Sequence, residues 1–224
     1  MSRRDRKSKT SKKDVKSIFQ ILTEGEETEP RYIRGYVEEY LKQRNCFDKV
    51  LFVSKPKNHD PKSLLDNAKE AKVSEADNVW IVFDRDGHDK IPETFDEAKE
   101  AGIEIAFSSI SFETWILMHF EYTTRQYATC DDLISDPRHF KKHIPDYEKA
   151  MPKLFAVATA NDGLAKAIKH AESLCKAVPR GYPEKTKIYE MNPYTDFYRL
   201  LDAIDDFLGI DKNDKRIEKG CQLK

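Results

Sequence analysis

The segment 78-NVWIVFDRDGH-88 decides the fold, because an apolar run ends there abruptly in two aspartates. Residues 78–84 are apolar at nearly every position, which is typical of a parallel strand that helices cover on both faces. Asp84 and Asp86 follow at the strand exit, and Gly87 allows a sharp turn of the backbone. The segment therefore predicts a buried strand of an α/β sheet with two carboxylates at its exit.

Short β-rich runs alternate with helical periods on both sides of this strand. In chain order we expect a strand at 17–23, a helix from Thr28, a strand at 50–54, a helix at 60–72 with Asp60 as N-cap, the strand at 78–84, a helix from Pro92 to Gly102 and a strand at 103–108. Four strands that alternate with three helices predict a parallel sheet flanked by helices.

The C-terminal half is expected to be mostly helical. The predicted helices lie at 112–120, about 146–158, 163–177 and 192–208, and Asn192 and Pro193 resemble the start of the last one. The pattern leaves open whether they lie across the sheet or beside it. We divide the chain into a disordered basic tail at 1–16, an α/β core at 17–120, a helical extension packed on it at 121–208 and a charged tail at 209–224.

Charge and composition exclude several classes of protein. The 224 residues have a net charge of -1, but residues 1–16 carry +6 and the remainder -7. No apolar run approaches the roughly 18 residues that cross a bilayer, so we expect a soluble, cytoplasmic protein with no membrane partner. The four cysteines are far apart and have neither a zinc-binding nor a disulfide spacing.

Acidic residues stand at several of the expected strand exits. Glu24 follows the first strand, and Asp84 and Asp86 follow the third. If these strands are neighbours, the three carboxylates converge, and a divalent cation, Mg²⁺ or Mn²⁺, would offset their repulsion. Taken singly, each has an ordinary explanation, since a DxD at a strand end is common and a Glu-rich turn is usually a solvated helix start.

Four ordered motifs carry a family resemblance. They are 23-TEGEETEPRYI-33, 82-VFDRDGH-88, 108-SSISFETWILMHF-120 and 192-NPYTDFYRLL-201. The Glu-Gly exit and the Asp-x-Asp resemble a Toprim domain, and the four motifs together resemble the RloB-like proteins, a Toprim-bearing bacterial family found near restriction and anti-phage loci. The resemblance implies a metal-dependent nuclease, with RNA such as tRNA favoured over DNA, and a role in defence. Ser109-Ile110-Ser111 departs from the pattern, where an Asn-Pro is expected.

The resemblance also implies roles for individual residues. Glu24 would be the general acid/base or a metal ligand, Asp84 and Asp86 would hold Mg²⁺, Glu26 would be a further ligand, and Glu113 and His119 would be additional catalytic candidates. Glu29 is ambiguous, because it begins a helix and a structural role is at least as plausible there. A structural role is also open for Glu113, which begins a helix, and for His119, which stands among large apolar residues where a core position is common.

Basic residues are the candidates for contact with nucleic acid. Arg138, Lys141 and Lys142 surround Phe140, whose ring can stack on a base. The basic tail can attract the same polyanion, and one of Lys149, Lys166 and Lys169 is expected to face the site. Beyond nucleic acid, we expect a partner ATPase or other defence protein that controls the activity, and a homodimer is a further expectation.

Two other functions compete with the nuclease. FDRDGH resembles the nucleophile loop of haloacid-dehalogenase-like phosphatases, in which Asp84 would attack phosphorus. That loop normally follows the first strand of its domain rather than the third, and Glu24 has no place in it. The third possibility is a Toprim-like module without catalytic activity that senses or binds a partner.

Overall fold

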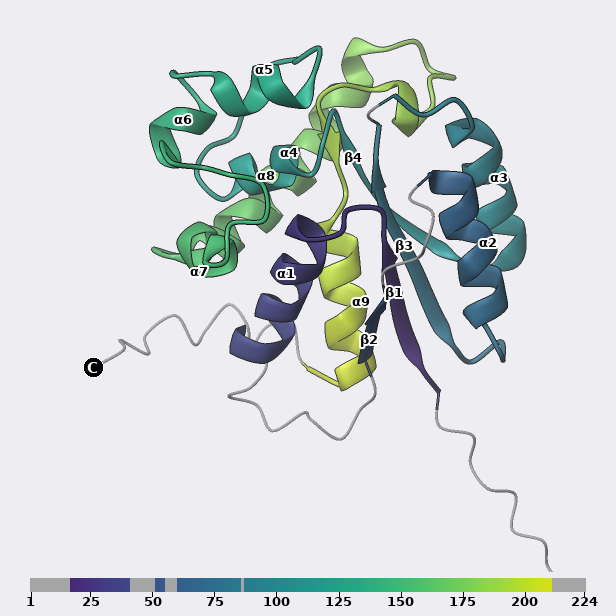
Figure 1. Ribbon diagram of the computed structural model, residues 1–224. Coiled ribbons are helices and arrows are strands. Elements are labelled where there is room, and N and C mark those ends of the chain that lie inside the picture. Colours follow the sequence, from purple (N-terminus) through teal and green to yellow (C-terminus); the bar gives the residue numbers. More distant parts are fainter. Residues whose placement is uncertain (1–16, 41–50, 55–59, 86, 211–224) are drawn as a thin grey trace, which may run out of the picture.

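The computed structural model describes residues 17–40, 51–54, 60–85 and 87–210 (Figure 1). The predicted tail at 1–16, nearly all of the one at 209–224, and Asp86 lie outside these residues. In chain order the elements are β1 (Phe19–Thr23), α1 (Thr28–Gly35), a π-helical turn (Tyr36–Tyr40), β2 (Leu51–Ser54), α2 (Pro61–Ala71), β3 (Asn78–Asp84), α3 (Ile91–Ala101), β4 (Glu104–Ser109), α4 (Glu113–Met118), α5 (Cys130–Ser135), α6 (Phe140–His143), α7 (Leu154–Thr159), α8 (Gly163–Ala177), two 3₁₀ turns (Val178–Gly181 and Ile188–Glu190), β5 (Tyr194–Thr195) and α9 (Tyr198–Leu208). Within the described ranges, no helix has the length and apolar character needed to span a bilayer.

The strands form one sheet in the order β2-β1-β3-β4-β5. The first four are parallel, which confirms the predicted α/β class, and β5 adds a short antiparallel edge. The chain moves from β1 to β2 in one direction and then crosses over β1 to reach β3 and β4 on the other side. This reversal of direction falls between β1 and β3, the type of position at which open parallel sheets bind ligands.

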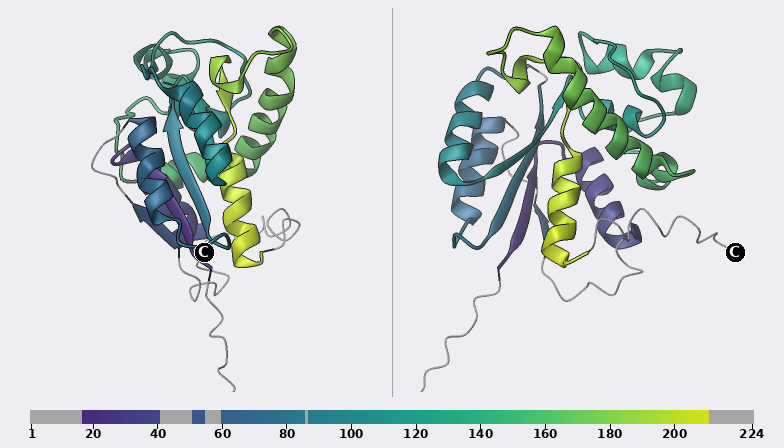
Figure 2. Two further views of the ribbon diagram at one scale, coloured as in Figure 1. Left: turned by 90° about the vertical axis from the view of Figure 1, so that its right-hand side faces the viewer. Right: turned by 180° about the vertical axis from the view of Figure 1, so that it is seen from behind.

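Helices cover both faces of the sheet, as Figure 2 shows from the side and from behind. α2 packs on β1 and β3 and α3 packs on β4, whereas α1 packs on β2 and α9 on β4 from the opposite face. Right-handed crossovers place α1 on one face and α2 and α3 on the other, because the chain changes its direction across the sheet after β2. α9 therefore lies across the sheet, while α4 to α8 gather beside it near the carboxyl ends of the strands (Figure 1).

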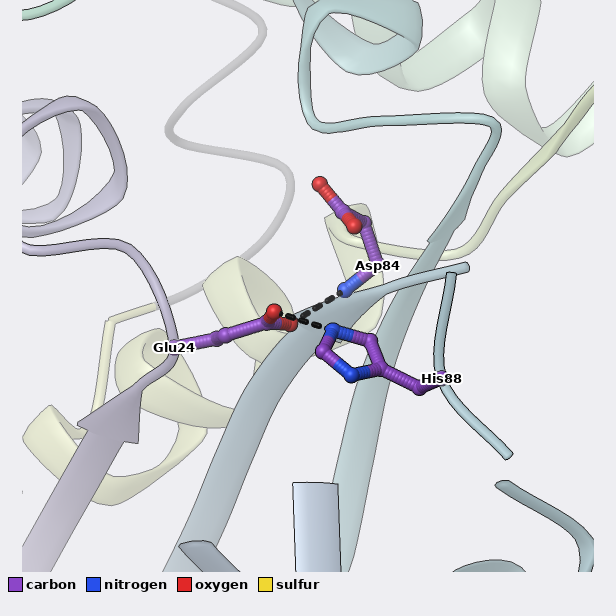
Figure 3. A group of neighbouring side chains, drawn as sticks. All are labelled: Glu24, Asp84 and His88. Carbon is purple, nitrogen blue, oxygen red and sulfur yellow. Dashed lines mark hydrogen bonds and ion pairs between the residues drawn. The ribbon is translucent and has the colours of Figure 1, made fainter. Parts of the chain in front are cut away.

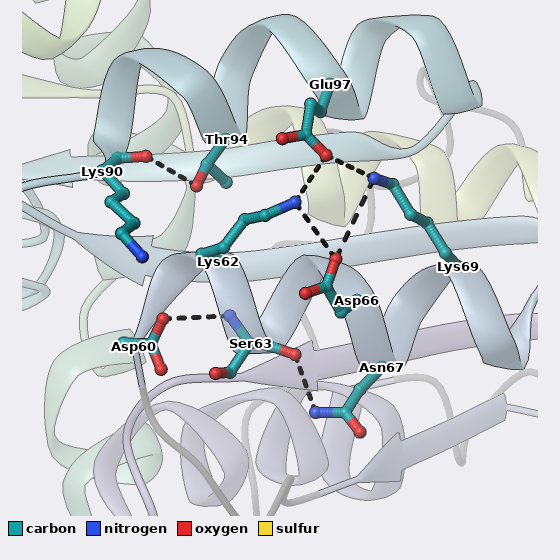
Figure 4. A network of polar contacts seen from close by, with 9 residues as sticks. All are labelled: Asp60, Lys62, Ser63, Asp66, Asn67, Lys69, Lys90, Thr94 and Glu97. Carbon is teal, nitrogen blue, oxygen red and sulfur yellow. Dashed lines mark hydrogen bonds and ion pairs between the residues drawn. The ribbon is translucent and has the colours of Figure 1, made fainter.

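Local signals explain where α2 and α3 begin and end. The Asp60 carboxylate accepts a hydrogen bond from Ser63 N at 3.0 Å, as predicted for an N-cap, and Gly102 ends α3 with a φ of 60°. Glu97 of α3 accepts hydrogen bonds from Lys62 at 2.5 Å and Lys69 at 2.6 Å of α2 (Figure 4). These partly exposed pairs orient two helices that apolar packing already holds together.

The expected helix at 192–208 begins later than the sequence indicates. Tyr194 and Thr195 form β5 and pair with Ser109 and Ser108 of β4. The buried Asp196 then accepts a hydrogen bond from Phe107 N of β4 at 2.8 Å. The chain therefore stays bonded to the sheet through Asp196, and the helix begins only at Tyr198. Asn192 and Pro193 are therefore not a helix start, and the predicted apolar face of the helix is retained from Leu200 onward.

Two further differences concern segments between the predicted helices. The helix expected at 146–158 is confined to α7, because Ala150 adopts a φ of 68°, which is incompatible with a helix. The polar stretch that follows α4, where the sequence analysis predicts no helix, contains α5 and α6. A capping box explains α5, since Thr129 and Asp132 exchange hydrogen bonds between their side chains and backbone N–H groups.

Tyr32 occupies the centre of the aromatic core between α1 and α4. Its ring makes edge contacts with the rings of Phe112, Trp115, Phe155 and Phe197 at centroid distances of 5.1–6.2 Å. Its hydroxyl lies 2.7 Å from His119 Nε2. The hydrogen bond thus joins the two helices inside the core.

His119 lies buried in this core beside Tyr32, and its expected catalytic role stays a prediction. Its Nδ1 lies 3.1 Å from the Trp115 carbonyl oxygen, so Nδ1 carries the proton and Nε2 accepts the hydrogen bond from Tyr32. Burial lowers the pKa of His119 to about 4 despite the Trp115 contact. A neutral ring with both nitrogens satisfied has a structural role.

Tyr32→Phe tests this arrangement. The substitution keeps the ring but leaves His119 Nε2 buried without a donor, so the free energy of unfolding should fall by about 1–3 kcal/mol. Urea denaturation measures the change. Tyr122→Phe, at a tyrosine that is 42% exposed, is the control and should have little effect. Equal stability of Tyr32→Phe and wild type would show that the hydrogen bond does not hold α1 against α4.

Candidate metal centre

Glu24 and Asp84 meet where the strand order reverses. Glu24 N donates to Val82 O at 2.9 Å, which extends the β1–β3 pairing by one residue past the end of β1. The register therefore places the exit of β1 beside the last residues of β3. The sequence predicted that these side chains would converge if the first and third strands were neighbours. β1 and β3 are neighbours, and Glu24 and Asp84 do lie together.

Glu24, Asp84 and His88 form a compact group of potential metal ligands (Figure 3). Glu24 Oε2 accepts a hydrogen bond from Asp84 N at 3.2 Å, and Glu24 Oε1 lies 2.5 Å from His88 Nε2. The three ligand atoms all lie within 4.8 Å of one another. A cation with ligands at about 2.0–2.6 Å can contact atoms at such separations. All three side chains are half-buried; the two carboxylates suit Mn²⁺ or Mg²⁺, and the imidazole is a ligand for other transition metals as well.

Sequence reasoning did not identify His88 as a ligand. The residue follows Gly87, whose φ of 74° turns the chain sharply after β3 and lets the imidazole reach back to Glu24. The sequence signal that could have identified His88 as a ligand is its position four residues after Asp84, in the segment that follows a strand. Asp86, the expected third carboxylate, is not among the described residues, and His88 supplies the third ligand that they contain.

Glu29 lies buried behind this group, whereas Glu26 is exposed. A Cβ on Gly25 would come within 1.9 Å of Glu29 Oε2, so with any other residue at position 25 the Glu29 carboxylate would have to move. Burial, together with the charges of Asp84 and Glu113, raises the pKa of Glu29 to about 7. The structure thus places Glu29, rather than Glu26, among the acidic groups of the centre.

Glu113 has a buried carboxylate at the start of α4. It accepts hydrogen bonds from Tyr147 OH at 2.7 Å and from Cys130 Sγ at 3.3 Å. These contacts tie α4 to α5 and to the segment before α7. The side chain interacts electrostatically with Glu29, so it stands near the centre, but its oxygens are engaged by neighbours within the protein.

Lys149 is the lysine that the fold brings to the centre. Tyr147, on one side of it, donates to Glu113, and Ala150 N, on the other side, donates to Thr28 Oγ1 at 3.2 Å. Lys149 is thereby fixed between the first turns of α4 and α1. Interactions with Cys130, Glu113 and Asp84 raise its pKa above the ordinary value despite partial burial.

The remaining basic candidates lie on the surface. Arg138 precedes α6, and Lys141 and Lys142 belong to it, all with exposed side chains. The ring of Phe140, expected to stack on a base, is instead buried against Tyr147 at a centroid distance of 4.9 Å. Contact with nucleic acid at these three basic residues stays a prediction.

Comparison with known proteins gives one match. The sequence profile described as RloB-like protein matches residues 19–204, which is most of the chain. No curated protein and no solved structure matches. The resemblance drawn from the four motifs is confirmed at the level of the family.

The raised pKa of Glu29 predicts a specific dependence of stability on pH. The carboxyl is expected to titrate near its ordinary value of 4.5 in the unfolded chain and at about 7 in the metal-free fold. The folded state therefore binds the extra proton, and this stabilisation is complete below about pH 4.5 and is lost as the pH rises through 7. The loss is on the order of 3 kcal/mol.

Glu29→Gln removes this titration. In EDTA, the variant should gain stability relative to wild type as the pH rises from 4.5 to 8, measured by urea denaturation at each pH. Glu26→Gln makes the same change on an exposed side chain three residues away and should follow the wild-type profile. Parallel profiles for Glu29→Gln and wild type would mean that Glu29 titrates as an ordinary carboxylate.

Proposed function

This chain belongs to the RloB-like family, and we propose that it is a Mg²⁺- or Mn²⁺-dependent nuclease that cleaves phosphodiester bonds in nucleic acid. The observation that carries the proposal is the group of Glu24, Asp84 and His88 at the reversal of strand order. The preference for RNA such as tRNA and the role in anti-phage defence come from the family resemblance alone. Control by a partner ATPase or other defence protein, and assembly into a homodimer, are part of the proposal on the same ground.

The residues present fit a divalent cation. Glu24, Asp84 and His88 would hold it, with Asp86 as a further candidate, and the cation would stabilise the negative charge that develops on the phosphate. The Glu24 carboxylate is held by Asp84 N on one oxygen and by His88 on the other. This fixed orientation serves either of the roles proposed for Glu24, as a ligand or as the group that takes a proton from the attacking water.

Lys149 supplies the positive charge that an acidic centre needs in order to accept a polyanion. Its anchors on both sides hold it near Asp84 and Glu113 while its side chain remains exposed. An ammonium group in this position can contact a non-bridging phosphate oxygen and stabilise charge in the transition state. Lys166 and Lys169, the other two lysines considered from the sequence, belong to α8 and are not proposed for this role.

Glu24→Gln tests the metal centre. The variant should bind Mn²⁺ at least about tenfold more weakly by isothermal titration calorimetry, because an amide oxygen replaces a charged ligand. Cleavage of RNA in Mn²⁺ or Mg²⁺ should be abolished. Glu27→Gln is a matched control, since Glu27 forms an ion pair with Arg31 at 2.7 Å on the surface of α1, and it should retain both properties.

Three results would contradict the proposal in different ways. Unchanged Mn²⁺ affinity in Glu24→Gln would remove this group as the metal site. Metal binding without cleavage of RNA or DNA would favour the module without catalytic activity. Hydrolysis of a phosphomonoester that Asp84→Asn abolishes and Glu24→Gln preserves would favour the phosphatase.

Lys149→Gln separates the binding of metal from the stabilisation of charge. We expect the single-turnover rate of cleavage at saturating metal to fall about a hundredfold, while Mn²⁺ affinity is retained or rises, since a nearby positive charge is lost. Lys153→Gln, at an exposed lysine just before α7, is the control and should cleave at the wild-type rate. An unchanged rate in Lys149→Gln would exclude contact between this lysine and the reacting phosphate.

A further inference from the structure

An open hollow of about 480 Å³ lies beside α5, outside the metal centre. Two stretches of chain, 125–128 and 135–138, form most of its lining, together with Asp132 of α5. Its volume falls in the range of pockets that hold a small ligand or a nucleotide unit. In Figure 1 this part of the chain stands beside α4, near the carboxyl ends of the strands.

The buried Asp136 organises one wall of the hollow. Its carboxylate accepts hydrogen bonds from Arg138 N at 2.9 Å and from Tyr127 OH at 3.2 Å. The same carboxylate pairs with Arg125 Nε at 3.1 Å and with Arg138 Nε at 3.8 Å. Its main-chain carbonyl accepts a hydrogen bond from Lys141 N at 3.0 Å. One acidic residue therefore gathers three basic residues on one surface.

The two arginines contact Asp136 through Nε and retain donors for a ligand. Within the described part of the chain, the terminal nitrogens of Arg125 and Arg138 have no hydrogen-bond partner, and their side chains are 43% and 71% exposed. The Arg125 guanidinium also lies 5.4 Å from the centroid of the Tyr127 ring, which restricts its orientation. Each guanidinium group thus contacts Asp136 through Nε and leaves its two terminal nitrogens available to a ligand.

We propose that the Arg125–Arg138 pair binds a backbone phosphate of the nucleic-acid strand, at a distance from the bond that is cut. The proposal rests on the proposed nuclease function. Guanidinium forks match the oxygens of a phosphate in geometry as well as in charge. Asp136 directs its carboxylate to Tyr127 and to the arginines, and Asp132 directs its own to Thr129, so the acidic groups of the lining are engaged within the protein.

α5 connects this subsite with the metal centre. Cys130, its first residue, donates to Glu113, while Asp136 directly follows its last residue. Six helical residues span about 9 Å, so a strand that reaches the centre can also reach the hollow within a few nucleotides. Arg138 and Lys141, expected from the sequence to meet nucleic acid, thereby acquire a defined partner in Arg125, which the sequence did not indicate.

The test uses binding in EDTA, where no metal-dependent cleavage occurs. Fluorescence anisotropy with a labelled single-stranded RNA compares wild type with the double variant Arg125→Lys/Arg138→Lys, which keeps both charges but loses the forks. We expect about tenfold weaker binding by the double variant. The control Arg34→Lys/Arg180→Lys carries the same substitutions at exposed arginines elsewhere and should bind as wild type does.

Asp136→Asn separates geometry from net charge. If the surface attracted RNA only through its charge, loss of the Asp136 carboxylate would tighten RNA binding. If Asp136 holds the two arginines in place, its loss should weaken RNA binding. Thermal unfolding confirms that each variant is folded. If Asp136→Asn does not fold, the double lysine variant decides the question by itself.

Equal affinity of the folded double lysine variant and wild type would overturn the subsite, as would the absence of RNA binding by wild type. A mononucleotide whose binding, but not that of the RNA, depends on the two arginines would identify a free nucleotide as the occupant and would also overturn it. Failure of the nuclease is separate, because Glu24→Gln reports on cleavage and leaves the arginines in place.

Discussion

The hydrogen bond from Glu24 N to Val82 O is the contact on which the rest of the site depends. It exists because β1 and β3 are direct neighbours although β2 lies between them in the sequence. The same arrangement sends the crossovers to opposite faces of the sheet, so no connecting helix closes over the ends of β1 and β3 from above. A one-residue change in this pairing would turn every side chain of β1 to the other face and separate Glu24 from Asp84.

Burial of acidic groups behind the centre requires compensation from several parts of the chain. Glu113 receives hydrogen bonds from Tyr147 and Cys130, and Lys149 adds a positive charge nearby. At Glu29 the effect of burial outweighs that of a backbone hydrogen bond, and the raised pKa expresses the cost of ionising the carboxyl there. The centre therefore combines Glu113, whose negative charge is stabilised by its neighbours, with Glu29, for which burial favours the protonated form.

Most of the sheet and two of the three candidate metal ligands could be predicted from the sequence, because the signals are local. The apolar run before Asp84 and the N-cap at Asp60 involve residues a few positions apart. His88 was not identified, and Glu29 and Lys149 could not be singled out among the candidates, since each reaches the centre through a turn or a long-range contact that periodicity does not report. The sequence left His119 open between a catalytic position and a core position. The hydrogen bond with Tyr32 shows that it lies in the core.

The short pairing of β5 with β4 has a consequence for the site as a whole. The chain leaves the sheet after Ser109 and returns at Tyr194, directly opposite, so the whole intervening excursion begins and ends at neighbouring points about 5 Å apart. This anchoring leaves the pairing among the parallel strands independent of the length of the excursion. Glu24, Asp84 and His88 lie outside it, whereas the arginines and the lysine proposed to hold the strand lie inside it. Substitutions in this excursion can therefore change the contacts proposed for nucleic acid while the candidate metal-binding group keeps its position on the parallel strands.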